Sequence, residues 1–405
     1  ANINNSQMKQ KVSSCVVIFL MLLCCKQWVA AQTYTPGISY LGTHGYTEYI
    51  PGSLPIIISA PHGGYLEPEV IPNRTCFDAV YATDAYTQEL IRDIQNSIYA
   101  EFGCYAHVVI NLLDRKKLDA NRNLAEGACG NDSAKQAWND FNDFLDIAEN
   151  TVMEQYGKGL YIDLHGHGNP KQRLEIGYLL YDDELQLTDA ELNTDTYINY
   201  SSIQHLVATN AGSFTHAELL RGAISFGTLM EEAGYASVPS AADPFPLTGD
   251  NYYSGGYNTV ERSSYSGGTI DGFQIECNYT GVRDNTENRK RFADSITIAL
   301  KAYLTTHYFI DKELSDCNQF VSIPQSDNVA TVIGIYPNPS GQYLFIASAI
   351  AIDAVKIYTT SGTELSNVHF DITKKQIDIS PLSPGFYFIR IDTGNFTSVQ
   401  SFVKL

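Results

Sequence analysis

Short apolar runs alternate with longer amphipathic ones from about residue 35 to residue 315. An unbroken apolar run of four to eight residues favours a buried strand, and apolar side chains spaced three and four apart favour a helix. On these grounds we predict strands at 54–60, 104–111, 160–164, 175–181 and 272–277, and helices at 83–102, 134–155 and 286–308. Strands that alternate with helices predict an α/β fold in which helices cover both faces of a sheet.

The segment 196–265 departs from this alternation and is rich in Tyr, Ser, Gly and Pro. An irregular region of this length in an α/β domain either shapes a binding cleft or covers the sheet, and the pattern leaves both open.

The pattern changes again after Cys317. Residues 318–328 are polar, and the chain beyond them alternates like short strands, as at 355–358, 376–379 and 385–391. We therefore divide the chain into upstream residues and a signal peptide (1–31), an α/β domain (32–316), a linker (317–332) and a small all-β sandwich domain (333–405).

The C-terminal domain carries several short motifs in order: YPNPS at 336–340, IYTTSGTEL at 357–365, IDISPLSPGFYFIRI at 377–391 and SFVKL at 401–405. Together they resemble the C-terminal sorting domain of the type IX secretion system of Bacteroidetes. The resemblance implies recognition by that machinery, export across the outer membrane and, usually, removal of the domain. On residue pattern alone, a carbohydrate-binding β-sandwich is the alternative.

The N-terminus has the features of a secretory signal. Basic residues at 8–11 precede an apolar run at 15–25, and small residues at 29–31 offer a cleavage site that leaves Gln32 first. The apolar run is too short to span a bilayer as a helix. The chain is therefore predicted to be secreted or attached to the cell surface, with no integral membrane segment in the mature protein.

The charge balance narrows the classes of partner. With 26 Lys and Arg against 45 Asp and Glu, the net charge is −19, which disfavours binding to nucleic acid or to anionic lipid. Five cysteines lie beyond the signal, and which of them pair does not follow from the sequence.

Candidate chemistry lies where predicted strands end. His62 follows the first strand and precedes two glycines and Glu67, and His165 ends another strand. Strand ends in open α/β sheets are where ligands bind. Two histidines and a carboxylate that leave a fourth position open are typical of catalytic zinc. Glu276, near the end of a late apolar strand, requires a partner or a function.

Five segments resemble, in order, those of the N-formylglutamate amidohydrolases: PHGG at 61–64, LDANR at 118–122, DLHGHG at 163–168, GGYNT at 255–259 and IDGFQIECN at 270–278. That family is similar to zinc carboxypeptidases and aspartoacylases, and HGGYLE at 62–67 is similar to the metal motif of phage poly-γ-glutamate hydrolases.

The resemblance implies a mixed, zinc-carboxypeptidase-like sheet with Zn²⁺ bound by His62, Glu67 and His165. It also implies that Glu276 activates water and later protonates the leaving amine. Asn121 and Arg122 would hold a substrate carboxylate.

Two matters stay open at this point. The carboxypeptidase spacing His-x-x-Glu places Tyr65 where the carboxylate should be, so we favour Glu67 and keep Glu69 as an alternative. Asp84 is interpreted as the N-cap of the following helix.

The predicted function is a secreted, zinc-dependent amidohydrolase that acts on an N-formyl or N-acyl amino acid, a γ-glutamyl compound or a peptide. The alternatives are a zinc exopeptidase and a non-catalytic binding protein or adhesin that keeps the fold.

Overall fold

The computed structural model describes residues 34–309 except 211, and residues 334–404 except 337–339, 348–351, 360–362, 366–367, 372–373 and 394–395. It divides into two units, residues 1–322 and 323–405, which are described separately. The predicted signal peptide and linker lie outside the described residues.

The first unit is built on an eight-stranded sheet with the order β1-β2-β4-β3-β5-β8-β6-β7. The central strands β4, β3, β5 and β8 are parallel, whereas β1, β2 and β6 join their neighbours towards the centre in antiparallel fashion. The predicted mixed sheet is confirmed. The strands are β1 (Tyr40–Leu41), β2 (Thr47–Ile50), β3 (Ile56–Ala60), β4 (His107–Asn111), β5 (Gly159–His167), β6 (Leu174–Gly177), β7 (Ser237–Val238) and β8 (Ile270–Asn278).

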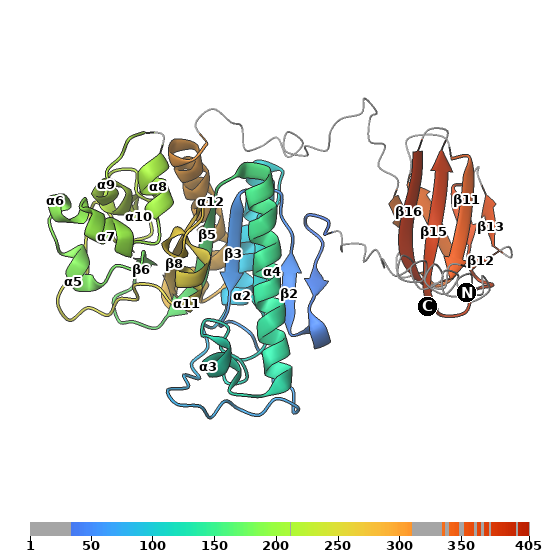
Figure 1. Ribbon diagram of the computed structural model, residues 1–405, viewed down its shortest axis with the longest axis horizontal. Coiled ribbons are helices and arrows are strands. Elements are labelled where there is room, and N and C mark those ends of the chain that lie inside the picture. Colours follow the sequence, from blue (N-terminus) through green and yellow to red (C-terminus); the bar gives the residue numbers. More distant parts are fainter. Residues whose placement is uncertain are drawn as a thin grey trace, which may run out of the picture. The chain divides into compact units, whose positions relative to one another are not determined.

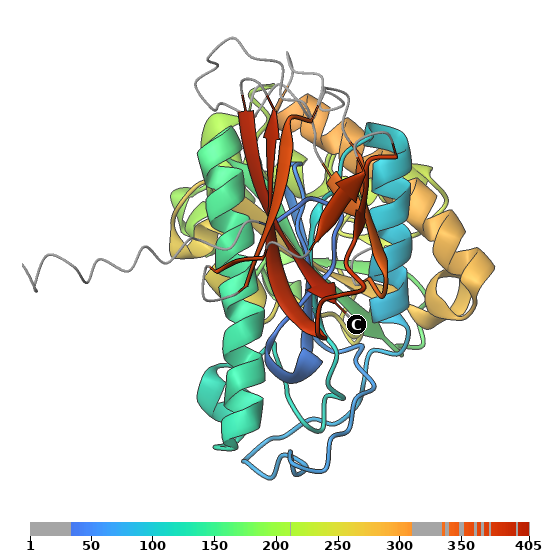
Figure 2. The same ribbon diagram turned by 90° about the vertical axis from the view of Figure 1, so that its right-hand side faces the viewer.

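Helices cover both faces of this sheet, as predicted (Figures 1 and 2). Ile56 and Ile58 of β3 face the cluster that contains α2 (Thr87–Phe102) and α12 (Thr286–His307), and Ile57 faces the cluster that contains α4 (Asp132–Tyr156). Successive side chains of a strand point to opposite faces, so one strand contributes to two cores.

The remaining helices are short and lie mostly in the region between β6 and β8. They are α3 (Leu124–Ala128), α5 (Asp182–Leu185), α6 (Asp189–Leu192), α7 (Asp195–Tyr200), α8 (Gln204–Thr209), α9 (His216–Arg221), α10 (Phe226–Glu232) and α11 (Tyr257–Arg262), with single turns η1 (Thr43–Gly45), η2 (Ser264–Ser266) and η3 (Tyr279–Arg283). Leu206, Leu220 and Phe226 of this region enter the core beside α12, so part of the irregular segment covers the sheet.

The second unit contains two four-stranded antiparallel sheets among its described residues, β13-β14-β10-β9 and β12-β11-β15-β16. Leu344 and Ile377 of the first sheet share one apolar cluster with Ile357 and Ile389 of the second, which confirms the small β-sandwich. The strands are β9 (Gly334–Tyr336), β10 (Tyr343–Ala347), β11 (Ala354–Thr359), β12 (Glu364–Leu365), β13 (His369–Asp371), β14 (Gln376–Asp378), β15 (Gly385–Thr393) and β16 (Phe396–Lys404).

Cysteine pairing, which the sequence left open, is partly settled. Cys76 and Cys129 form a disulfide that ties the loop after β3 to the end of α3, and Cys104 is also disulfide-bonded. Cys277 is a buried free thiol. In the described part of the chain, no helix combines the length and apolar character needed to cross a bilayer.

Candidate metal centre

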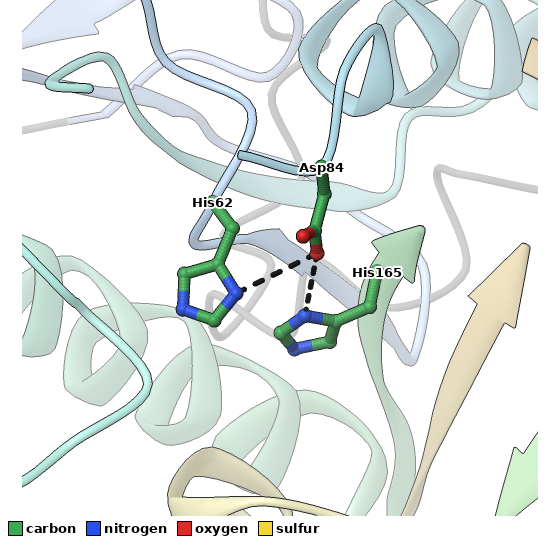
Figure 3. A group of neighbouring side chains, drawn as sticks. All are labelled: His62, Asp84 and His165. Carbon is green, nitrogen blue, oxygen red and sulfur yellow. Dashed lines mark hydrogen bonds and ion pairs between the residues drawn. The ribbon is translucent and has the colours of Figure 1, made fainter. Parts of the chain in front are cut away.

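Three buried side chains meet at one edge of the large sheet: His62, Asp84 and His165 (Figure 3). One potential ligand atom from each lies within 4.8 Å of the others. His62 follows β3, His165 belongs to β5, and Asp84 lies just before α2. Because β3 and β5 are parallel neighbours, their carboxyl ends share an edge, and the connection from β3 to α2 begins and ends there.

The two imidazole rings both direct Nδ1 towards the Asp84 carboxylate (Figure 3). Asp84 Oδ2 lies 3.0 Å from His165 Nδ1 and 3.5 Å from His62 Nδ1, and it accepts a hydrogen bond of 3.1 Å from the Gly166 amide. Two nitrogens and a carboxylate oxygen therefore converge on one point.

The Nε2 atom of each ring, on the side away from Asp84, lies against a carboxylate of its own. His62 Nε2 lies 2.6 Å from Asp119 Oδ1, and His165 Nε2 lies 2.9 Å from Asp163 Oδ2. Carboxylates in this position fix the ring orientation and the tautomer of histidines that bind metals. With Nε2–H donated to Asp119, His62 presents the lone pair of Nδ1 to the centre.

The Nδ1 atom of His62 is buried, and no group among the described residues forms a hydrogen bond with it. A buried polar atom without a partner loses its contacts with water and gains nothing in return. A metal ion at this point would satisfy it, so the donor set fits a cation with nitrogen and oxygen ligands.

Three carboxylates beside the two histidines, Asp84, Asp119 and Asp163, have lowered pKa values. Burial by itself would raise the pKa of Asp119, but the nearby charges of His62 and Arg115 outweigh it and lower that pKa. At Asp163 burial would also raise the pKa, but the neighbouring His165 outweighs it and lowers that pKa. At Asp84, too, burial alone would raise the pKa, but the neighbouring His165 and His62 outweigh it and hold that pKa well below its usual value. Ionised carboxylates at this density favour binding of a cation.

Glu276 lies beside His165, which it faces in the register of β5 and β8. It is only 6% exposed, and burial, opposed by His165, raises its pKa to about 8. Gln274 Nε2 donates a 3.0 Å hydrogen bond to it. Its burial without a formal charge partner sets it apart from carboxylates that stabilise a fold.

Neither arginine near Glu276 in the sequence forms an ion pair with it among the described residues. Arg283 donates to the carbonyls of Cys277, Ala85 and His167. Arg262 binds acidic groups of α4 instead.

A cavity of about 910 Å³ opens over this group. Its lining includes His62, Asp84, His165 and Glu276, together with Asn121, Arg115 and Arg122 and part of the irregular segment, Tyr252 to Tyr257. The segment 196–265 therefore has both of the roles that the sequence left open.

The two residues predicted to hold a substrate carboxylate differ in their surroundings. Arg122 has a 40% exposed side chain in the pocket wall, 3.5 Å from Glu126. Asn121 accepts a hydrogen bond of 2.8 Å from the Asn258 amide, and its Nδ2 lies 3.1 Å from His165 Nε2. Asn121 thus connects the start of α11 to the histidine, whereas Arg122 is accessible to a ligand.

The structure does not bring Glu67 to the group. Its side chain is 47% exposed and pairs with Lys116 at 2.7 Å, and the alternative, Glu69, is exposed as well. The reason is backbone pairing, because Leu66 exchanges hydrogen bonds with Leu112 and Asp114 and so holds the chain beside the segment that follows β4.

The two glycines after His62 allow close packing against neighbouring segments. A Cβ at Gly63 would lie 2.2 Å from Thr87 Oγ1, and one at Gly64 would lie 2.3 Å from the Leu112 carbonyl carbon.

Asp84 was assigned the wrong role by sequence. Helix α2 begins at Thr87, and the residue before it is Tyr86 in a left-handed conformation, so Asp84 is not the N-cap. The available signal was topological: the residue that leads into the helix after β3 must return to the edge where β3 ends.

Comparison with protein families identifies the C-terminal unit. Residues 334–405 match the model of the secretion system C-terminal sorting domain. Such a domain marks proteins that the type IX secretion system exports to the cell surface or the extracellular space, so the predicted localisation is confirmed.

The solved structures that are similar to this chain include three proteins of low sequence identity. N-formylglutamate amidohydrolase from Ralstonia eutropha JMP134 is 13% identical, with a TM-score of 0.36 over 62% of this chain and 94% of its own. An N-acetylmuramyl-L-alanine amidase from Mycobacterium abscessus is 13% identical, with a TM-score of 0.28 over 62% and 98%. Succinylglutamate desuccinylase from Chromobacterium violaceum is 12% identical, with a TM-score of 0.29 over 76% and 78%. Comparison with curated proteins finds no match.

Proposed function

We propose that the exported α/β unit is a zinc-dependent amidohydrolase that cleaves an amide bond in a substrate bearing a carboxylate. The observation that carries the proposal is the buried convergence of His62, Asp84 and His165 next to a buried, unpaired glutamate. The carboxylates behind both rings, Asp119 and Asp163, support it.

His62 and His165, each through Nδ1, and Asp84 through its carboxylate would hold the metal. Two imidazoles and one carboxylate form a three-residue set that suits Zn²⁺ and leaves a position open for water or substrate. When bound there, zinc supplies Lewis-acid chemistry, since it polarises a carbonyl and lowers the pKa of water towards ~7.

Glu276 is the proposed general base and acid. It removes the proton from the attacking water and then delivers this proton to the nitrogen of the leaving amine, so the amide ends as an acid and an amine. Because Glu276 lies beside His165, its pKa falls when a cation is held there. Its carboxylate is then ionised near neutral pH and can accept a proton.

Two arginines provide positive charge in the pocket. Arg122 is placed to bind the substrate carboxylate through two parallel hydrogen bonds, the geometry that a guanidinium favours. Arg115 lies deeper, with its Nε 3.0 Å from Asp119 Oδ2, and it orients the carboxylate that holds His62. Asn121 accepts a hydrogen bond from the Asn258 amide and lies against His165, and in this position it orients that second histidine.

A non-catalytic binding protein would not require a buried glutamate at the position of Glu276. A buried carboxylate with no charge partner lowers stability unless it has a task. Its position beside the proposed metal ligands therefore favours an enzyme over an adhesin.

The experiment is removal and return of the metal. Purified protein should contain one zinc per chain by elemental analysis. A chelator should abolish hydrolysis of N-acyl amino acids and peptides, and added zinc should restore it. Full amide hydrolysis by the metal-free protein would contradict the proposal.

A further inference from the structure

The pocket is large for a substrate of one residue. Cavities of roughly 300–1,000 Å³ accommodate ligands of drug size, and this one measures about 910 Å³. The metal ligands and Glu276 make up only a small part of its lining. Most of the cavity would therefore contact parts of a substrate that lie away from the cleaved bond.

Four tyrosines belong to the remaining lining: Tyr181, Tyr252, Tyr253 and Tyr257. We call these four residues the tyrosine wall. Tyr181 and Tyr253 are 63% and 49% exposed. Large aromatic faces bind apolar and planar groups, and the hydroxyl of an exposed tyrosine can also form a hydrogen bond with a ligand.

The tyrosine wall is anchored to the sheet. The Tyr253 amide donates a 3.0 Å hydrogen bond to Glu175 Oε2, and the Tyr252 hydroxyl donates a 2.7 Å hydrogen bond to the Ile176 carbonyl. Both acceptors belong to β6. The segment is therefore held in place before any ligand arrives, which reduces the entropy lost on binding.

Buried charges provide part of this anchor. Glu175 is 1% exposed and Arg173 is 2% exposed. Arg173 pairs with Asp243 at 2.6 Å and with Asp250 at 3.1 Å, both in the stretch that leads to Tyr252. Buried charges are unfavourable unless they are paired, so their use here indicates that the position of this segment matters.

We propose that the substrate is a peptide of three or more residues, whose residues beyond the cleaved amide bind the tyrosine wall. This inference rests on the proposed function. Because the proposed reaction breaks an amide, a chain joined by amides supplies both the reactive bond and the further units. Export by the sorting domain places the enzyme among extracellular polymers.

The first test is a series of substrates of increasing length: N-acyl amino acids, then di-, tri- and tetrapeptides, with α- and γ-linked glutamyl versions of each. We expect kcat/KM to rise at least about tenfold from one residue to three, the size of one added aromatic contact. Equal kcat/KM for all lengths would overturn the proposal.

The second test locates the length preference. Tyr253→Ala and Tyr181→Ala should lower kcat/KM for the tripeptide, mainly through KM, by about tenfold, and by more than for the single residue. The control is Tyr265→Ala, since Tyr265 is 43% exposed but does not line the pocket; it should change neither value. Equal losses for short and long substrates would overturn the role of the tyrosine wall.

Three other outcomes separate this inference from the function on which it depends. Zinc-dependent hydrolysis of single N-acyl amino acids only would leave the proposed function intact and overturn the peptide preference. Binding of soluble glycans that competes with peptides at the tyrosine wall, with no gain in rate on longer peptides, would also overturn it. Hydrolysis of no substrate by the zinc-loaded protein would overturn both.

Discussion

The two units bury different kinds of side chain. The core of the C-terminal unit is apolar, with Ser340 and Lys404 the buried polar residues among those described. The α/β unit has large apolar clusters too, but it also buries Asp84, Asp163 and Glu276 at one edge of its sheet. Folding explains the first core. Apolar burial does not explain the second set, because buried carboxylates lower stability unless neighbouring groups compensate them, as the two histidines do at Asp84 and Asp163.

This contrast indicates where the chemistry of the protein lies. The sorting unit needs only a stable shape that the export machinery can recognise. The α/β unit keeps unfavourable charges together at the carboxyl ends of parallel strands, the edge at which open α/β sheets bind ligands. The following predictions test this contrast, from the largest expected effect to the smallest.

The largest effect is expected at the metal ligands. Asp84→Asn and His165→Ala should abolish stoichiometric zinc binding and activity, because each removes one of three protein ligands. The loss in zinc affinity should exceed the roughly 10- to 100-fold loss caused by removing an outer partner of a ligand. Zinc content and turnover measure it.

Glu67→Gln is the matched control for Asp84→Asn. Glu67 pairs with Lys116 at an exposed position, so this variant should keep its zinc and its activity. Retention of zinc by Asp84→Asn together with its loss in Glu67→Gln would restore the ligand set that the sequence suggested.

Glu276→Gln should separate catalysis from metal binding. It keeps the size of the side chain but cannot accept the proton, so turnover should fall about 10²–10⁴-fold, with zinc content and melting temperature nearly unchanged. Glu149→Gln is the control, because Glu149 is a largely buried carboxylate that pairs with Arg262 outside the pocket. An active but destabilised Glu276→Gln protein would remove Glu276 from the mechanism.

Asp119→Asn tests the carboxylate behind His62. The amide cannot stabilise the ring as the carboxylate does, so zinc affinity should drop about 10- to 100-fold while saturating zinc restores much of the activity. Competition with a chelator of known affinity measures the change. An unchanged affinity would show that Asp119 serves only its arginine partners, Arg74 and Arg115.

Arg122→Lys should act on substrate binding alone. Lysine cannot reproduce the two parallel hydrogen bonds of a guanidinium, so KM for substrates with a carboxylate should rise about tenfold, equivalent to ~1.4 kcal/mol. Zinc content should not change. An equal loss on a neutral amide would instead assign Arg122 a structural role.

Removal of the C-terminal unit should have the smallest effect on catalysis. It contributes no residue to the proposed site, and it forms its own apolar core. A chain that ends at Gln325 should fold and keep full kcat/KM, as circular dichroism and the peptide assay would show, but it should not be exported. Failure of this chain to fold would mean that the α/β unit depends on the sorting unit.

Prediction from sequence succeeded where a structure depends on neighbours along the chain. The strand near 54–60 and the helix near 134–155 follow from side-chain periodicity, which local geometry dictates. The sandwich at 333–405 follows from repeated alternation and short motifs. His62, His165 and Glu276 stood out because each lies at or near the end of an apolar strand, and the structure places all three around one pocket.

The rest of the site depends on contacts between distant segments. Topology returns the connection after β3 to the edge where β3 ends, but the sequence does not show that the side chains of His62 and Asp84 meet there. The exposed course of Glu67 depends on pairing of Leu66 with Leu112 and Asp114. Asp119 was likewise not assigned to His62 from the sequence.

The sequence by itself determined the C-terminal sorting domain, the two-unit organisation and the kinds of side chain available for the proposed chemistry, because these follow from composition, motifs and short-range periodicity. Only the tertiary structure decided which carboxylate joins the two histidines, which carboxylates hold their far nitrogens, and that a segment rich in tyrosine borders the pocket. These depend on strand order and on loop paths, which many weak contacts between remote residues fix together.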